Sequence, residues 1–432
     1  MLMGAWHRLD SRLPHAVIVS MPVRGHTTSA APRWSPAIRL LVDHPRTVAW
    51  RPGAVAGALL ARGLHLRAYP IWPSTLHPRI AADVSHAPAA AWLQRTFEHD
   101  APRRHLVGPA TWSAMRSRGL VVGPPSALVN EAVEHATGRD IADRKLALYS
   151  ATGQSLSKAA CFVFERGADE PALVVKAMPD ARYASRLIHE TEIIEAFRDR
   201  LGAGSPAAEA LPLAPLFAGT AAAEFVVVQS VDPLAASTGF LSDPADAIEW
   251  LREFQDGTTT TVRPWDEADT ETALDPVRYA WERSRPASAD GVVSRARRLL
   301  RALEGQPVRR CGVHGDFWRD NIAQQDGRLR VYDWEWAHPE GPPFFDLWTT
   351  ELGLLRRQAE EGSPRLLESL REALARVSAE HGRQRVDGRF ALATLAPSLA
   401  HLVFRVRRAT GVPGGAETES VALLTAVEAL LT

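Results

Sequence analysis

The feature that most constrains this chain is a group of polar residues between residues 311 and 350. In chain order the group consists of His314, Asp316, Asn321 and Asp333. After Asn321 come two strand-like runs, 321–324 and 328–332, and Asp326-Gly327 between them is typical of a two-residue hairpin turn. A hairpin folds the chain back on itself, so we expect Asp333 to return close to Asn321.

These residue types suit phosphoryl transfer from a nucleotide that carries Mg²⁺. One carboxylate accepts the proton of the attacking hydroxyl, while an amide oxygen and a second carboxylate hold the metal against the phosphates. Four residues separate Asp316 from Asn321, as in the catalytic loop of protein kinases. We therefore predict Asp316 as the catalytic base and Asn321 and Asp333 as ligands of Mg²⁺. His314 is expected to orient the loop. Ordinary turn-capping acids would explain one Asp, but not the ordered group of four.

The segment resembles the aminoglycoside phosphotransferase and choline kinase-like family, whose mark is His-Gly-Asp, four residues, Asn, and then Asp-x-Glu. Glu335 completes that pattern, and the run from Pro343 to Leu347 is similar to the Pro-x-x-Asp-Leu segment that follows in the family. The resemblance covers roughly the last three hundred residues. It implies an α+β, protein kinase-like fold of two lobes, with a small antiparallel sheet lobe and a mainly helical lobe. It also implies ATP and Mg²⁺ as cofactors, and a hydroxyl group of an aminoglycoside, sugar or amino alcohol as acceptor.

The chain is expected to divide into three parts. Residues 1–123 are rich in proline, which opposes long helices, and form an extra N-terminal domain of unknown role. Residues 124–231 form the kinase-like N-lobe, and residues 232–432 form the helical C-lobe with the catalytic loop. Because the N-terminal part carries no recognisable catalytic set, a chain that starts near Gly123 is expected to keep nucleotide binding.

A lysine and a glutamate are predicted to hold the nucleotide phosphates. Lys176 shares a strand face with Val174 by the period of two, and a lysine on an apolar face needs a partner. On the following helix, Glu190 lies on the same face as Leu187 and Ile194, whereas the other two nearby glutamates do not. In the kinase plan this lysine contacts the α- and β-phosphates and pairs with the helix glutamate. The alternative is a strand-end lysine that reaches water.

Other nucleotide contacts are predicted on either side of that pair. Residues 150–157 connect two strands and contain Ser155 and Ser157, whose hydroxyls and backbone N–H groups would donate to phosphate oxygens. The loop lacks a G-x-G-x-x-G pattern, so an ordinary hairpin turn is the alternative. The strand over residues 224–231 resembles the strand and hinge that bind adenine through backbone groups, which assigns Gln229 and Val231 to the nucleotide.

Acceptor contacts are expected next to the second metal ligand. Glu335 follows Asp333 by two residues and is predicted to contact the acceptor or the metal's surroundings, with solvent exposure as the alternative. Trp336 is predicted to stack on a sugar or cover a cationic acceptor, as are three further tryptophans nearby. For at least half of these four, core packing is the expected role. The other three are Trp318, Trp334 and Trp348.

The charge balance and the cysteine count argue against several classes of partner and cellular location. Lys+Arg and Asp+Glu are both 50, so the formal net charge of zero argues against a nucleic-acid partner. The two cysteines, Cys161 and Cys311, form no disulfide framework or zinc spacing, which fits a reducing cytoplasm. We expect no signal peptide and no membrane span. The sequence leaves the oligomeric state open.

Two alternatives to a small-molecule kinase stay open. The first is a kinase-like, nucleotide-binding module without catalysis that acts as a scaffold or binds a partner; the intact polar group argues against it. The second is a kinase whose acceptor is a protein or a lipid-linked glycan, although the sequence lacks the membrane helix or basic patch that would favour it.

Overall fold

The computed structural model divides the chain into two compact units. Unit 1 comprises 1–191 and 213–236, and unit 2 comprises 192–212 and 237–432. The structure describes residues 36–43, 46–48, 67–73, 78–83, 86–97, 120–140, 143–150, 158–178, 183–232, 234, 244–282, 294, 297–298, 300–317, 321–341, 345–360, 365–383, 391, 395 and 398. Within these ranges, no helix is both long and apolar enough to cross a membrane.

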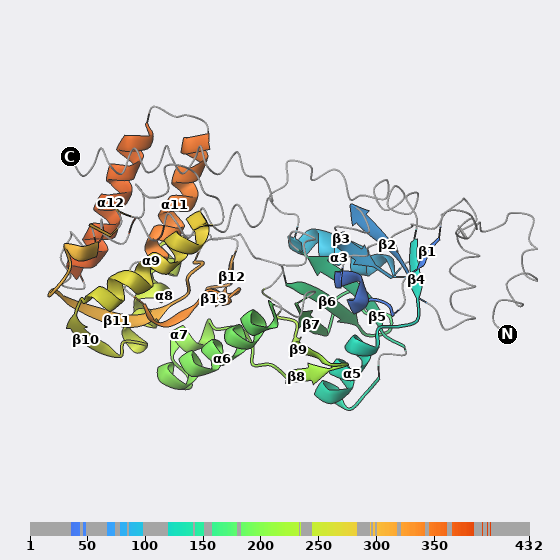
Figure 1. Ribbon diagram of the computed structural model, residues 1–432. Helices are drawn as coiled ribbons and strands as arrows, with labels where there is room; N and C mark the ends of the chain where they lie inside the picture. The colour runs from blue at the N-terminus through green and yellow to red at the C-terminus, as the bar shows by residue number, and fades with distance from the viewer. Residues whose placement is uncertain are drawn as a thin grey trace, which may run out of the picture. The chain divides into compact units, whose positions relative to one another are not determined.

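Unit 1 is built on a nine-stranded antiparallel sheet with the order β1-β4-β2-β3-β5-β6-β7-β9-β8 (Figure 1). The strands are β1 (Arg46–Val48), β2 (Arg67–Pro73), β3 (Pro78–Ala82), β4 (Leu120–Gly123), β5 (Lys145–Ser150), β6 (Ala159–Phe164), β7 (Leu173–Ala177), β8 (Phe217–Ala221) and β9 (Glu224–Ser230). Strands β5 to β9 make the small sheet expected for a kinase-like N-lobe, and valine, phenylalanine and other β-formers fill their buried faces.

The strands before Pro124 continue this sheet rather than forming a sheet of their own. Strand β3 pairs with β5, and Ala81 lies opposite Leu148 in the register. Strands β2, β4 and β1 then extend the sheet beyond β3. The expected division at residue 123 therefore does not coincide with a break in the sheet. The aromatic run in β2, Tyr69 to Trp72, has side chains outside the described set.

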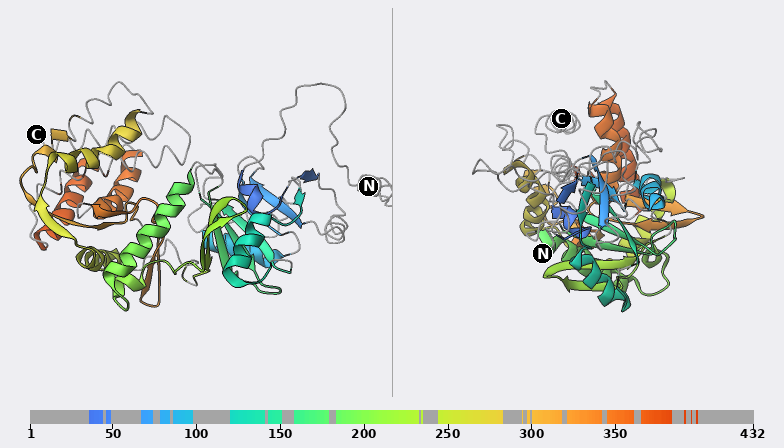
Figure 2. Two further views of the ribbon diagram at one scale, coloured as in Figure 1. Left: turned by 60° about the horizontal axis from the view of Figure 1, so that its bottom comes forward. Right: turned by 90° about the vertical axis from the view of Figure 1, so that its right-hand side faces the viewer.

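One face of the sheet is covered by helix α5 (Ala127–Thr137). Ser126 caps its start by accepting a hydrogen bond from the Val129 N–H at 3.3 Å, and Gly138 ends it with φ 69°. The helix buries Val129 and Val133 against alternate residues of the sheet, together with the short helix η1 (Pro36–Leu40). Figure 2 shows α5 beside the strands.

The other face is partly covered by helix α3 (Ala87–Phe97), which comes from the N-terminal part. Trp92 packs against Phe162 of β6 with ring centroids 4.7 Å apart, and against Phe164 at 6.1 Å. Val174 of β7 belongs to the same buried cluster. Burying an aromatic side chain of this size contributes about 1.5–3 kcal/mol, so the N-terminal part stabilises the sheet it joins.

Unit 2 is mainly helical, as expected for the C-lobe. Helix α6 (Ala184–Leu201) has its first turns in unit 1 and its remainder in unit 2. The other helices are α7 (Pro206–Glu209), α8 (Pro244–Gly257), α9 (Glu267–Glu282), α11 (Phe345–Glu360) and α12 (Leu366–Arg383). The strands are β10 (Thr261–Pro264), β11 (Pro307–Val313) and β14 (His338–Gly341) in one sheet, and β12 (Ile322–Gln325) with β13 (Arg328–Val331) in another. Helices α11 and α12 lie side by side (Figures 1 and 2).

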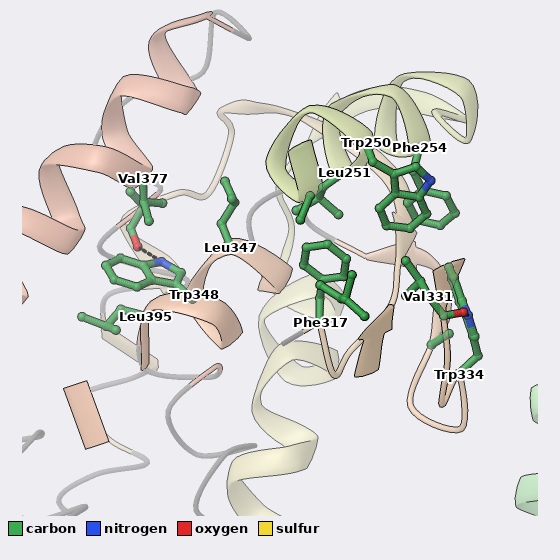
Figure 3. Packing of buried hydrophobic residues seen from close by; sticks show 14 of the residues in the cluster. Trp250, Leu251, Phe254, Phe317, Val331, Trp334, Leu347, Trp348, Val377 and Leu395 are labelled. Atoms are coloured by element: carbon green, nitrogen blue, oxygen red, sulfur yellow. Dashed lines mark hydrogen bonds between the residues drawn. The ribbon is translucent and has the colours of Figure 1, made fainter. Parts of the chain in front are cut away.

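An aromatic cluster holds the centre of unit 2 (Figure 3). Trp250 stacks on Phe254 at 5.1 Å and on Phe317 at 5.4 Å between ring centroids, and Trp334 meets Phe254 edge-on at 5.4 Å. Phe317 directly follows Asp316 in sequence, and Trp334 directly follows Asp333. The core therefore anchors two of the predicted functional residues through their immediate neighbours.

Candidate active site

Strand β11 leads into the loop that carries Asp316. The strand is buried over most of its length, and the residues from His314 to Phe317 that follow it are buried as well. Gly315 has φ 78°, and a Cβ there would lie 2.2 Å from the Trp336 carbonyl oxygen. Only glycine fits both the left-handed backbone and this close approach. The Gly of the His-Gly-Asp run is thus required by the path of the chain.

The side chain of Asp346, at the start of α11, binds backbone N–H groups of this loop. Its Oδ2 accepts a hydrogen bond from the His314 N–H and its Oδ1 from the Gly315 N–H, both at 2.8 Å. The carboxylate is fully buried, and this burial raises the pKa of Asp346 to about 7, although the two N–H groups oppose the shift. The family resemblance singled out Asp346, but its task of fixing two successive backbone amides could not be read from the sequence.

His314 connects the loop to the segment that precedes Asp333. Its Nδ1 accepts a hydrogen bond from the Asp316 N–H at 3.1 Å, so its Nε2 carries the proton and donates to the Tyr332 carbonyl at 2.9 Å. The ring lies edge-on to Trp334 at 4.5 Å between centroids. Both ring nitrogens are used in the framework, which is the geometry of a residue that orients a loop.

The predicted hairpin is confirmed, and it brings the two predicted metal ligands together. Asp326 and Gly327 form its turn with φ 53° and 74°, as a two-residue turn of this kind requires. The Tyr332 N–H donates to the Asn321 carbonyl at 2.8 Å, so Asp333 follows the residue that pairs with Asn321. Asp333 itself has φ 67°, a left-handed conformation that Asp tolerates better than most residues.

The side chain of Asn321 is oriented by the loop. Its Nδ2 donates to the Asp316 carbonyl at 2.9 Å, and this bond fixes which end of the amide is the oxygen. The amide oxygen of Asn321 and the carboxylate of Asp333 are hard oxygen ligands of the type that Mg²⁺ takes in company with phosphate oxygens and water. Among the described residues, no three His, Cys, Asp or Glu side chains cluster as a metal site. Asn321 and Asp333 stay the predicted ligands of Mg²⁺.

The tryptophans of this segment differ in burial, and two of the four have the core-packing role expected for at least half of them. Trp334 and Trp348 are fully buried core residues, and their indole N–H groups donate to the carbonyls of Val331 and Ala391. Trp336 is partly buried and packs against the core, and Glu335 next to it is also partly buried. Trp318 lies outside the described residues.

In unit 1, the partner of Glu190 differs from the expected one. Glu190 is buried on α6, whereas Glu192 and Glu195 are exposed, which confirms the argument from the helix face. Its Oε2 forms an ion pair with the Nζ of Lys158 at 2.6 Å. This contact corrects the predicted pairing with Lys176, which lies on β7 opposite Ala160. The sequence signal was present, because Lys158 precedes Ala160 by two residues and so shares its strand face.

Of the four other residues predicted to contact the nucleotide, two lie in the described part of the chain. Gln229 is buried, and its Nε2 donates to the Leu213 carbonyl at 2.8 Å. Val231 follows β9, and its N–H donates to the Ala172 carbonyl at 3.0 Å, so that N–H belongs to the strand pairing. Ser155 and Ser157 lie outside the described residues.

Comparison with known proteins gives a family match. Residues 153–386 match the model of the phosphotransferase enzyme family. Among solved structures, aminoglycoside phosphotransferase APH(4)-Ia is found at 16% identity and a TM-score of 0.42, over 63% of this chain and 90% of that one. A glucosamine kinase in complex with glucosamine, ADP and inorganic phosphate is found at 18% identity and a TM-score of 0.37, over 66% of this chain and 82% of that one. The comparison with curated proteins finds no match.

Proposed function

Since the chain belongs to the phosphotransferase enzyme family, we propose that it transfers the terminal phosphoryl group of ATP to a hydroxyl group of a small molecule, with Mg²⁺. The observation that carries the proposal is the linked loop and hairpin of unit 2. Asn321 donates to the Asp316 carbonyl, and the backbone of Tyr332, just before Asp333, pairs with Asn321. A base and two oxygen ligands are thus tied into one framework.

The proposed reaction uses Asp316 as the base. The acceptor's O–H bond breaks as its proton passes to the Asp316 carboxylate, its oxygen forms a bond to the terminal phosphorus, and the bond to the leaving ADP oxygen breaks. Asn321 and Asp333 would hold Mg²⁺, which neutralises phosphate charge when bound. His314 and Asp346 hold the Asp316 loop in place from either side, so the base needs little rearrangement before transfer.

Residues of unit 1 are assigned to the nucleotide. Ser155 and Ser157 donate to phosphate oxygens, Gln229 and Val231 are placed at the adenine, and positive charge comes from the sheet face that carries Lys176. Glu190 is buried and forms its ion pair with Lys158, whose Nζ lies 2.6 Å from the Glu190 Oε2. The proposed nucleotide contacts all come from the segment around residues 150–231.

The acceptor is proposed to be an aminoglycoside, sugar or amino alcohol. Glu335 and Trp336 lie two and three residues after Asp333 in sequence, and both are partly buried. A carboxylate and an indole suit an acceptor that carries a cation beside its hydroxyl. The free thiols Cys161 and Cys311 are both buried and fit a reducing compartment, so we place the reaction in the cytoplasm.

The test is ADP release with Mg·ATP and a panel of amino sugars, neutral sugars and amino alcohols. Asp316→Asn should leave the Mg·ATP dissociation constant within about threefold of wild type and lower turnover by roughly 10²–10⁴-fold, the usual loss of a general base. Asp326→Asn makes the same chemical change at an exposed turn of the same segment and should leave turnover unchanged. Wild-type turnover in Asp316→Asn would contradict the role of the base. Nucleotide binding without transfer to any acceptor would favour the non-catalytic module instead.

A further inference from the structure

We propose that helix α3 of the N-terminal part forms one wall of the surface that receives the nucleotide base, and that Trp92 positions this wall. The inference rests on the proposed function and deepens it, because it adds an element from upstream of Pro124 to the nucleotide site. All the residues in the argument belong to unit 1. The N-terminal part carries no catalytic set, but it packs on the sheet face that carries Lys176.

The place of the base follows from the two nucleotide residues assigned on β7 and β9. Lys176 is assigned to the phosphates and Val231 to the adenine. The Val231 N–H donates to the Ala172 carbonyl at 3.0 Å, which is four residues before Lys176, or about 13 Å along an extended strand. A nucleoside with its first two phosphates bridges such a span. Val174 lies midway on the same strand face, so the base lies beside Val174.

Helix α3 borders that position. Val174 is 7% exposed and shares a buried cluster with Trp92 and Leu93 of α3. Phe162 lies opposite Val174 in the register of β6 and β7, and Trp92 packs on the Phe162 ring with the centroids 4.7 Å apart. The row of the sheet at the level of the base is therefore held from one side by the N-terminal helix.

The sheet face next to α3 is partly open. Tyr149 of β5 and Ala160 of β6 pack against the α3 cluster but are only partly buried, and Val231 is as well. Ala160 lies opposite Lys176, so these residues extend from the level of the adenine to the level of the phosphates. A planar, largely apolar base suits this surface, with α3 at its side.

Trp92 is a positioning residue in this arrangement. Its side chain is 4% exposed, so it acts on the base through the Phe162 ring and through the placement of α3. It also meets Phe164 at 6.1 Å between centroids, and His86, just before α3, lies edge-on to the same ring at 5.3 Å. Because buried side chains are close-packed, a smaller side chain at Trp92 lets Phe162 and α3 shift together.

Competition against a fluorescent ATP analogue tests the base separately from the phosphates. Trp92→Leu should raise the dissociation constant of Mg·ATP by roughly 5–20-fold, since the base loses apolar contact, and should leave that of Mg·triphosphate within about twofold. Trp92→Phe keeps a ring and should fall between wild type and Trp92→Leu. Val129→Ala, which removes packing by α5 on the opposite face of the sheet, should change neither constant.

Three outcomes would overturn the inference while leaving the proposed function in place. Equal losses for Mg·ATP and Mg·triphosphate would show that Trp92 only supports the sheet. Tighter Mg·ATP binding to Trp92→Leu would show that α3 obstructs the base, and unchanged binding would show that α3 lies away from it. If the wild type binds no Mg·ATP at all, the proposed function fails, and this inference fails with it.

Amide hydrogen exchange of the unaltered protein is a second test that needs no substitution. Mg·ATP should slow exchange in α3, and Mg·triphosphate should slow it much less, because only ATP carries the base. Helix α5 on the opposite face is the control and should exchange at the same rate with either ligand. Slower exchange in β7 with Mg·ATP and no change in α3 would contradict the inference.

Discussion

The buried carboxylate of Asp346 should make the stability of the protein fall as the pH rises from mildly acidic to neutral. Burial raises the pKa of Asp346 to about 7 from the ordinary value of 3.8. The folded protein therefore binds this proton more tightly than the unfolded chain does. The contribution of Asp346 to stability is fully present below pH 3.8, and it is lost as the pH rises through about 7.

The size of the effect follows from the shift. Between the two pKa values, each pH unit removes up to about 1.4 kcal/mol of unfolding free energy, so the whole interval amounts to roughly 4 kcal/mol. The activity should change in the opposite direction. The deprotonated carboxylate accepts from both the His314 and the Gly315 N–H groups, whereas a protonated carboxyl uses one oxygen as a donor and holds the loop less well.

Urea unfolding of wild type and Asp346→Asn between pH 5 and pH 8 measures this contribution. The variant has no proton to release, so the unfolding free energy of the wild type minus that of the variant should fall over this range. Asp326→Asn, at an exposed position, serves as the matched control and should show no such trend. If the difference between wild type and Asp346→Asn stayed constant from pH 5 to pH 8, the argument from burial would be wrong.

Three further predictions concern the site and the sheet. Asp333→Asn should weaken Mg·ATP binding, measured by calorimetry, far more than it changes the melting temperature, because Asn also tolerates the left-handed backbone. Gly315→Ala should destabilise the protein by more than about 2 kcal/mol in urea unfolding, since its Cβ meets the Trp336 carbonyl, whereas Gly327→Ala, with similar φ and open space, should cost only about 1 kcal/mol. Trp92→Ala should cost about 3–5 kcal/mol because it removes the packing on β6, and a loss below 1 kcal/mol would show that α3 adds little to the sheet.

Local spacing predicted the parts of the site that lie close together in sequence. The Asp326-Gly327 turn, the return of the chain beside Asn321 and the inward direction of Glu190 are set by the periods of strands and helices, and the structure confirms them. The partner of Glu190 could not be chosen in this way, because Lys158 and Lys176 satisfy the same period-of-two argument. The register between β6 and β7 puts both lysines on one face, and the contact of Lys158 with Glu190 at 2.6 Å is visible only in the structure.

The strand pairing of the N-terminal part could not be predicted from local sequence patterns, for a different reason. Pro70 and Pro73 lie within β2, and Pro78 begins β3, although proline cannot donate to a strand ladder and usually argues against an inner strand. Pairing between β3 and β5 joins residues such as Ala81 and Leu148, which are far apart in the chain. No periodicity within either strand indicates which distant partner it meets.

The pairing of β3 with β5 covers what would otherwise be an edge of the kinase-like sheet. Without the N-terminal strands, β5 would be the outermost strand of a five-stranded sheet, and its unpaired N–H and C=O groups would be open to strands of other chains. The side chains of Leu146 and Leu148 on that strand are fully buried and apolar, which makes an open edge there prone to self-pairing. The strands upstream of Pro124 thus cover the β5 edge of the sheet. A chain that begins at Gly123 would expose this edge even if every predicted catalytic residue were present.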